Sequence, residues 1–264
     1  MQHEFKSEVL TRFCRTVAML LTGFILGSCG GGGGGGPTIV PTDASPGGIW
    51  SGTDSTSGLA VTGLVTEAGE FHVIRSDNVQ YFGTMSVSRN NVSGNFTGVT
   101  PVGSVFPGGS TTGTGTISGT VQERVSASLA TSFRPAGGAT STSNLLLTFS
   151  SLYNRASSLA TIAGNYLDPT TNAIINVNSN GVVFSQDAVT GCVITGTISI
   201  INAMFNAYRV QYSFASCRAP NTILNGTTAN GLGTLDNTVT PERAIIGVVN
   251  ATPGYSYAGA FPRT

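Results

Sequence analysis

Residues 80–99 read QYFGTMSVSRNNVSGNFTGV, and this stretch decides the fold class. In residues 80–88 and again in 91–99, apolar or small side chains alternate with polar ones, which is the period of a β-strand with one buried face. Asn90 and Asn91 separate the two runs and favour a turn, because asparagine tolerates a left-handed backbone. The stretch therefore predicts two antiparallel strands joined by a hairpin.

The same period of two continues along the chain from residue 49 onward. Asn180-Gly181 lies between two apolar runs and predicts a hairpin with a type I′ turn, since both residues accept a positive φ. Only residues 152–163 favour a short helix. Further strands are predicted at residues 59–65, 70–74, 113–121, 125–133, 145–152, 173–177, 181–185, 192–201, 207–214, 231–237, 244–249 and 255–261.

This pattern predicts an all-β fold, an antiparallel barrel or sandwich built from two weakly similar halves. TMSVS at 84–88 resembles TGTIS at 195–199, which places the halves at residues 49–157 and 158–264. Two arrangements fit: two small β domains side by side, or two halves that close one barrel. We favour one continuous barrel or sandwich, because a half of about 110 residues buries less core per residue than the whole.

Charged residues make up 9% of the chain, and the formal net charge is zero. Lys6 is the single lysine of the chain and lies near the N-terminus, as Arg12 and Arg15 do. The chain beyond residue 28 therefore has no lysine, and its net charge is close to zero. This excludes the basic surface that nucleic-acid binding requires. Serine, threonine, asparagine and glycine take the surface positions instead, as is common in exported β proteins.

Leu26-Gly27-Ser28-Cys29 ends a short apolar run, VAMLLTGFIL at 17–26, that follows the basic residues named above. The run is too short to span a membrane, which takes about 20 residues. The segment resembles the lipobox of bacterial lipoprotein signal peptides. The resemblance implies that residues 1–28 are removed and that Cys29 becomes the first residue, acylated on its thiol and on its new amino terminus.

The same resemblance implies a place in the cell envelope. Gly30 is not the aspartate that retains enteric lipoproteins in the inner membrane, so the outer membrane is expected, on its periplasmic face or at the cell surface. Two or more acyl chains hold a protein to a bilayer stably. Residues 29–48, rich in glycine and proline, predict a flexible tether between the lipid and the folded part.

Cys192 and Cys217 are the two cysteines left after Cys14 is removed with the signal and Cys29 is acylated. An even pair in an exported domain predicts a disulfide. Its loop of about 26 residues corresponds to roughly 3 to 4 kcal/mol of stabilisation in the chain-entropy model.

No motif predicts catalysis, a metal site or a cofactor, and we expect a protein that is not an enzyme. His72 is the single histidine beyond residue 3, and it alternates with Phe71 and Val73, so it is expected to face solvent. Histidine and cysteine are too few for a zinc site. Glu67 and Glu70 flank a turn and leave one enzymatic alternative, hydrolysis of an envelope glycan by a carboxylate pair.

Four tyrosines are candidate binding residues. Tyr208 and Tyr212 share one face of an extended segment, and so do Tyr255 and Tyr257. Aromatic side chains on an open sheet face favour contact with a protein or a glycan. We therefore expect a lipid-anchored, non-enzymatic envelope protein that binds a macromolecule or supports the envelope.

Gly48-Ile49-Trp50 resembles the Gly-x-Trp that opens the first strand of lipocalins. The resemblance implies a barrel with an internal cavity. The alternative function is therefore a lipocalin-like carrier of a small apolar ligand, while a tryptophan that closes the end of any β core explains the same residues.

Overall fold

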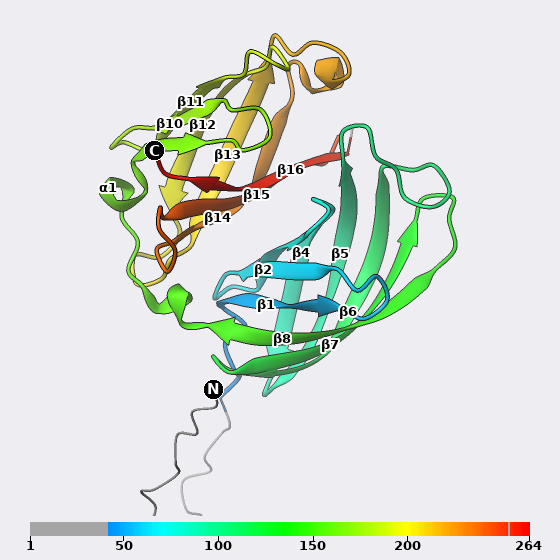
Figure 1. Ribbon diagram of the computed structural model, residues 1–264. Coiled ribbons are helices and arrows are strands. Elements are labelled where there is room, and N and C mark those ends of the chain that lie inside the picture. Colours follow the sequence, from blue (N-terminus) through cyan, green and yellow to red (C-terminus); the bar gives the residue numbers. More distant parts are fainter. Residues whose placement is uncertain (1–41, 253) are drawn as a thin grey trace, which may run out of the picture. The chain divides into compact units, whose positions relative to one another are not determined.

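The first eight strands of the computed structural model close into an antiparallel barrel in sequence order (Figure 1). Each strand pairs with the next, and β8 pairs with β1 to complete the circle. We call this unit the N-terminal barrel. Its strands are β1 (Gly48–Asp54), β2 (Ala60–Val65), β3 (Glu70–Arg75), β4 (Gln80–Ser88), β5 (Asn91–Pro101), β6 (Thr112–Gln122), β7 (Ser126–Pro135) and β8 (Ser141–Ser150). The structure describes residues 42–252 and 254–264.

The hairpin predicted from residues 80–99 is confirmed as β4 and β5, which pair from Gln80↔Val99 to Ser88↔Asn91. Glycines share the inward face with bulky residues, and this lets aromatic rings lie flat against the backbone. A Cβ atom at Gly98 would lie 2.6 Å from the ring of Phe133, closer than real Cβ contacts allow. The glycines of these strands therefore make room for the aromatic core.

The other eight strands form a second antiparallel meander, which we call the C-terminal sheet. Its edge strands β9 and β16 meet at one bridge, Tyr166↔Arg263, and Thr264 donates to the Asn165 carbonyl beside it. The strands are β9 (Gly164–Leu167), β10 (Ile174–Val177), β11 (Val182–Gln186), β12 (Val193–Ile200), β13 (Tyr208–Ala215), β14 (Thr228–Asp236), β15 (Arg243–Asn250) and β16 (Tyr255–Pro262).

These elements confirm the predicted fold class, an antiparallel β fold with a closed barrel. The expectation that both halves close a single barrel is wrong, because β4 pairs with β5 and β8 with β1. Eight strands are enough to close a barrel, and the interior of such a barrel is narrow enough for side chains to fill it. The first half of the chain therefore closes its own sheet by pairing β8 with β1, without strands from the second half.

The barrel and the sheet nonetheless share a buried junction. Strand β16 pairs in parallel with the end of β5, at Tyr255↔Thr100 and Ser256↔Pro101. Gln80, fully buried, donates from its amide to the carbonyls of Val248 and Tyr257 at 3.0 Å each. A separate apolar cluster also spans the junction, formed by Ile49, Leu64, Tyr153, Ala207 and Leu232. Together these contacts make residues 41–264 one compact unit.

The helix expected at residues 152–163 is present only as two short turns, η1 (Ser151–Asn154) and α1 (Leu159–Ile162). The hairpin at Asn180-Gly181 joins β10 to β11 as predicted, but only Gly181 has a positive φ, of 77°. The type I′ assignment is therefore wrong. The amide of Gly181 donates to the carbonyl of Asn178, as in a three-residue loop that ends in a left-handed glycine.

Residues 42–47 lie against the end of the N-terminal barrel that holds the β4–β5 turn. The amide of Ala44 donates to the Arg89 carbonyl, and the amide of Ser45 donates to Glu123. The tether predicted over 29–48 therefore ends earlier than expected, because its last residues have partners on the barrel. Cys29 and the predicted signal peptide lie outside the described residues. Within those residues, no helix is long and apolar enough to cross a membrane.

Candidate functional site

The N-terminal barrel contains a cavity of about 450 Å³. The cavity lies at the end of the barrel that carries the β1–β2, β5–β6 and β7–β8 loops, since residues of all three line it. Its apolar lining consists of Val61, Phe71, Val73, Tyr81, Phe96, Phe106, Pro107, Ile117, Phe133, Pro135, Ala139 and Leu145. A largely apolar concave site of this size is typical of small-molecule binding.

Aromatic rings form one wall of this cavity. Phe96 and Phe133 stack with their centroids 6.0 Å apart, and Tyr81 meets both rings edge to face. Phe106, from the β5–β6 loop, packs on Phe133 at 4.9 Å. The strands thus supply a rigid aromatic wall, and the loop adds a ring at the mouth.

Charged groups at the mouth are paired with one another. Arg75 donates through Nε and Nη2 to the two carboxylate oxygens of Asp77, at 2.9 and 2.7 Å, and through Nη1 to the Tyr81 hydroxyl at 3.1 Å. Burial alone would raise the pKa of Asp54, but hydrogen bonds led by the Ser143 hydroxyl outweigh it and lower that pKa. The mouth therefore presents compensated charges above an apolar interior.

The opposite end of the barrel is closed by Trp50. Its ring is 3% exposed, meets Phe149 edge to face at 5.4 Å, and donates from Nε1 to the carbonyl of Pro46. The chain thus enters the barrel at the closed end, away from the cavity mouth. This position of Trp50 matches its sequence interpretation as the residue that closes a β core.

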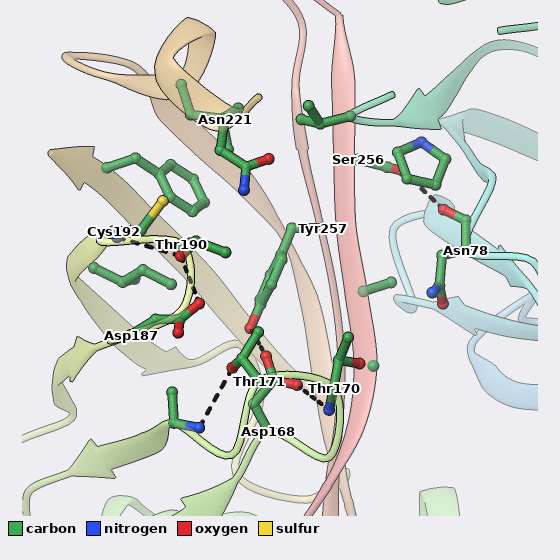
Figure 2. Close-up of a pocket in the computed structure, with 18 of the residues that line it drawn as sticks. Asn78, Asp168, Thr170, Thr171, Asp187, Thr190, Cys192, Asn221, Ser256 and Tyr257 are labelled. Atoms are coloured by element: carbon green, nitrogen blue, oxygen red, sulfur yellow. Dashed lines mark hydrogen bonds between the residues drawn. The ribbon is translucent and has the colours of Figure 1, made fainter. Parts of the chain in front are cut away.

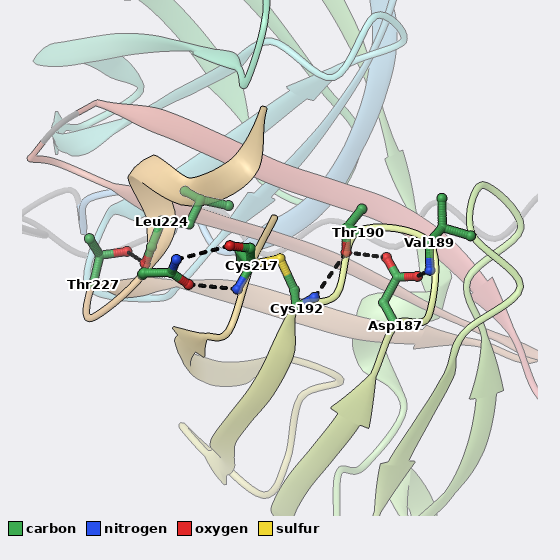
Figure 3. The surroundings of a disulfide bond; sticks show 8 residues. Asp187, Val189, Thr190, Cys192, Cys217, Leu224 and Thr227 are labelled. Atoms are coloured by element: carbon green, nitrogen blue, oxygen red, sulfur yellow. Dashed lines mark hydrogen bonds between the residues drawn. A yellow bond between two sulfur atoms is a disulfide. The ribbon is translucent and has the colours of Figure 1, made fainter. Parts of the chain in front are cut away.

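The predicted disulfide between Cys192 and Cys217 is confirmed. The bond joins the residue just before β12 to a residue just after β13. Figure 3 shows it beside the loop of Asp187 and Thr190. The Thr190 hydroxyl accepts from the Cys192 amide and donates to Asp187, while Asn225 brackets Cys217 with two hydrogen bonds. The bond therefore fastens two loops at one end of the C-terminal sheet.

The four candidate tyrosines do not form an open face. Tyr208 and Tyr212 do share a face, but it is the interior one, and they are 1% and 0% exposed. Burial raises the pKa of Tyr212. The expected exposed aromatic surface is therefore wrong for this pair, since the sheet curls over it. Tyr255 and Tyr257 are half-buried and line a second cavity.

His72 is buried, at 5% exposure, so its expected solvent-facing position is wrong. As the alternation predicts, the His72 side chain lies on the outer face of the barrel, whereas the side chain of Phe71 lies on the inner face. That face is covered by the C-terminal sheet, which packs β14 and β15 against β3. The imidazole stacks on Phe82 at 5.7 Å, and its Nδ1 atom has no partner among the described residues. Burial lowers the pKa of His72 to about 4.

Glu70 holds a bidentate ion pair with Arg209 of β13, at 2.9 and 2.6 Å. The hydrogen bonds from Arg209 lower the pKa of Glu70. A glycosidase acid needs the opposite shift, a raised pKa. Glu67 accepts from the Ser45 hydroxyl and lies 3.8 Å from Arg124. Both glutamates thus have structural partners, and Glu70 links the barrel to the sheet.

Two buried carboxylates, Asp168 and Asp187, were not predicted as site residues. Each stands at a turn, where aspartate usually caps its own backbone, so its sequence context gave no signal. The cavity of the N-terminal barrel was missed as well, because its lining residues come from all eight strands and three loops.

Comparisons of the chain with protein-family models, curated proteins and solved structures gave no match. The fold and the site together define a class, an up-and-down antiparallel β-barrel with an internal apolar cavity.

Proposed function

We propose that the N-terminal barrel binds a small apolar molecule, as the lipocalin-like alternative predicted. The observation that supports this function is the apolar cavity of about 450 Å³ inside a closed eight-stranded barrel. A barrel of this strand number either fills its interior with side chains or holds one small ligand. Here Trp50 fills the closed end and leaves the other end hollow.

The ligand is neutral over most of its length. Twelve apolar side chains line the cavity, and the arginine at its mouth is already paired with Asp77. Transfer of an unpaired charge into such a site is strongly unfavourable. Burial of apolar surface supplies the affinity instead, at about 25 cal/mol per Å².

The proposed location remains the outer membrane, to which acyl chains on Cys29 anchor the protein. The described chain begins at the closed end of the barrel, where Ala44 and Ser45 bond to turn residues. Anchoring through that end leaves the cavity mouth at the far end free. A ligand is therefore able to enter without passing the attachment point.

The test is fluorescence titration of the purified protein with N-phenyl-1-naphthylamine, a neutral apolar dye. We expect saturable binding. Val73→Trp fills the cavity and should weaken binding at least tenfold. Val125→Trp is the matched control, because Val125 is 51% exposed and lies in the β6–β7 turn at the other end. Equal binding by Val73→Trp and the unmodified protein, with both folded by circular dichroism, would contradict the proposal.

A second candidate, contact with a macromolecule, is favoured by an exposed apolar patch on the outer face of β10 and β11. Ile174, Val182 and Phe184 are 43%, 48% and 49% exposed, and Phe184 lies opposite Asn176 in the ladder. Crosslinking on intact cells tests it. Loss of a specific crosslinked product in Phe184→Ser would support this role, and an unchanged pattern would argue against it.

A further inference from the structure

A second cavity, of about 550 Å³, lies on the inner side of the C-terminal sheet beside the disulfide, and Asn78, Pro101 and Val102 of the N-terminal barrel also line it (Figure 2). The cavity lies at the end of the C-terminal sheet that carries the β9–β10, β11–β12 and β13–β14 loops, and residues of all three loops line it. Much of its wall is apolar, formed by Ile194, Phe214, Leu224, Ala229, Tyr257 and Phe261. Unlike the cavity of the N-terminal barrel, it also contains buried carboxylates.

Asp168 and Asp187 line this cavity, and each is 7% exposed. Asp168 accepts from the Tyr257 hydroxyl at 3.0 Å, and Figure 2 shows that hydroxyl directed at the carboxylate. Asp187 accepts from the Thr190 hydroxyl and from a backbone amide. Among the described residues neither carboxylate has an ion-pair partner, and the lining contains no arginine or histidine. The lining of this cavity thus holds two buried carboxylates and no cationic side chain.

Asn250 supplies an independent observation. It lines the same cavity, is 3% exposed, and follows Ile246 and Val248 on the inward face of β15. Its Oδ1 atom accepts from the Thr252 amide at 2.8 Å. Its Nδ2 atom is buried and has no acceptor in the part of the chain that the structure describes. A buried donor without a partner is destabilising, and an acceptor on a ligand removes this cost.

We infer that this cavity binds a small protonated amine that also carries a hydrogen-bond acceptor. The carboxylates of Asp168 and Asp187 match the ammonium group, and the acceptor takes the free amide hydrogen of Asn250. The rings of Phe214 and Tyr257 add apolar contact and a face for the cation. Burial and the neighbouring Asp168 raise the pKa of Tyr257 well above its usual value, so its hydroxyl stays a donor.

A bare metal ion fits this cavity less well than an organic cation. Calcium takes six to eight oxygen ligands, and a structural zinc site takes four nitrogen or sulfur ligands. Within the described residues, no group of three or more His, Cys, Asp or Glu side chains is placed to hold a metal. The aromatic wall likewise favours a ligand with an apolar body.

Isothermal titration of the purified protein with phenylalaninamide tests the inference. This probe carries an ammonium group, a carbonyl and a ring. We expect saturable binding at neutral pH, and at least tenfold weaker binding of N-acetylphenylalaninamide, which is uncharged. Asp187→Asn should weaken binding of phenylalaninamide at least tenfold. Its Oδ1 atom can still accept from the Val189 amide, while its Nδ2 atom donates to the Thr190 hydroxyl instead of accepting from it. Glu123→Gln removes a carboxylate far from the cavity and should change nothing.

Asn250→Leu separates the two parts of the recognition. This variant should weaken the binding of phenylalaninamide and leave unchanged the binding of phenethylamine, which lacks the carbonyl. Equal affinity for the charged and acetylated probes, full affinity in folded Asp187→Asn, or no binding by the folded protein would each overturn the inference. Displacement of phenylalaninamide by calcium chloride but not by sodium chloride would overturn the assignment to an organic cation. Dye binding in the N-terminal barrel is a separate measurement that none of these variants should change.

Discussion

Acidification should weaken the junction between the barrel and the sheet through His72. The imidazole is 5% exposed, and its pKa falls from an ordinary 6.5 to about 4 because of burial, partly opposed by the charge of Glu70. The folded protein therefore holds His72 neutral, whereas the unfolded chain binds a proton below about pH 6.5. Stability from this group is complete above that pH and is lost as pH falls toward the folded pKa.

The size of the effect follows from the two pKa values. A shift of one unit corresponds to 1.36 kcal/mol, so the whole linkage amounts to about 3 kcal/mol. Between pH 7 and pH 5 the expected loss is about 2 kcal/mol. Carboxylates such as Glu70, whose pKa is lowered by Arg209, add their own loss mainly below pH 5.

Urea unfolding at several pH values measures this loss, and Trp50 reports it as the single tryptophan of the chain. The comparison is with His72→Phe, which keeps a ring against Phe82 and removes both the titration and the unpartnered Nδ1 atom. The variant should lose much less stability between pH 7 and pH 5 than the unmodified protein. Equal pH slopes in the two proteins would refute the assignment to His72.

Three further predictions follow from other features. Cys29→Ala should release the protein from membranes or block its maturation, as read by fractionation after a salt wash, and an unchanged membrane fraction would contradict the lipid anchor. Replacing Cys192 and Cys217 by serine should lower the free energy of unfolding by about 3 to 4 kcal/mol, measured with and without reductant. Gly98→Ala should force the Phe133 ring to move, cost about 1–3 kcal/mol and weaken dye binding, because the new Cβ would lie 2.6 Å from that ring.

Local pattern predicted much of the fold because each strand pairs with its sequence neighbour. The hairpin of Gln80 and Val99 needs only alternation and a turn, and both are visible in residues 80–99. Closure of the barrel depends on how β8 meets β1, about 100 residues apart, and no local signal carries that register. The same limit explains His72: alternation gives its face, but the sheet that covers this face lies far along the chain.

The β3–β4 loop connects the two candidate sites physically. Asp77 of this loop pairs with Arg75 at the mouth of the barrel cavity, and Asn78 lines the cavity of the C-terminal sheet. The Asn78 carbonyl accepts from the Ser256 hydroxyl at 2.7 Å, so the loop is bonded to β16 as well. Any ligand that displaces this loop on binding moves Asn78 in the wall of one cavity and, through the pair of Asp77 with Arg75, changes the mouth of the other. Linkage then requires each ligand to alter the affinity of the other by the same factor, so titrating the dye with and without the amine measures whether the loop couples them.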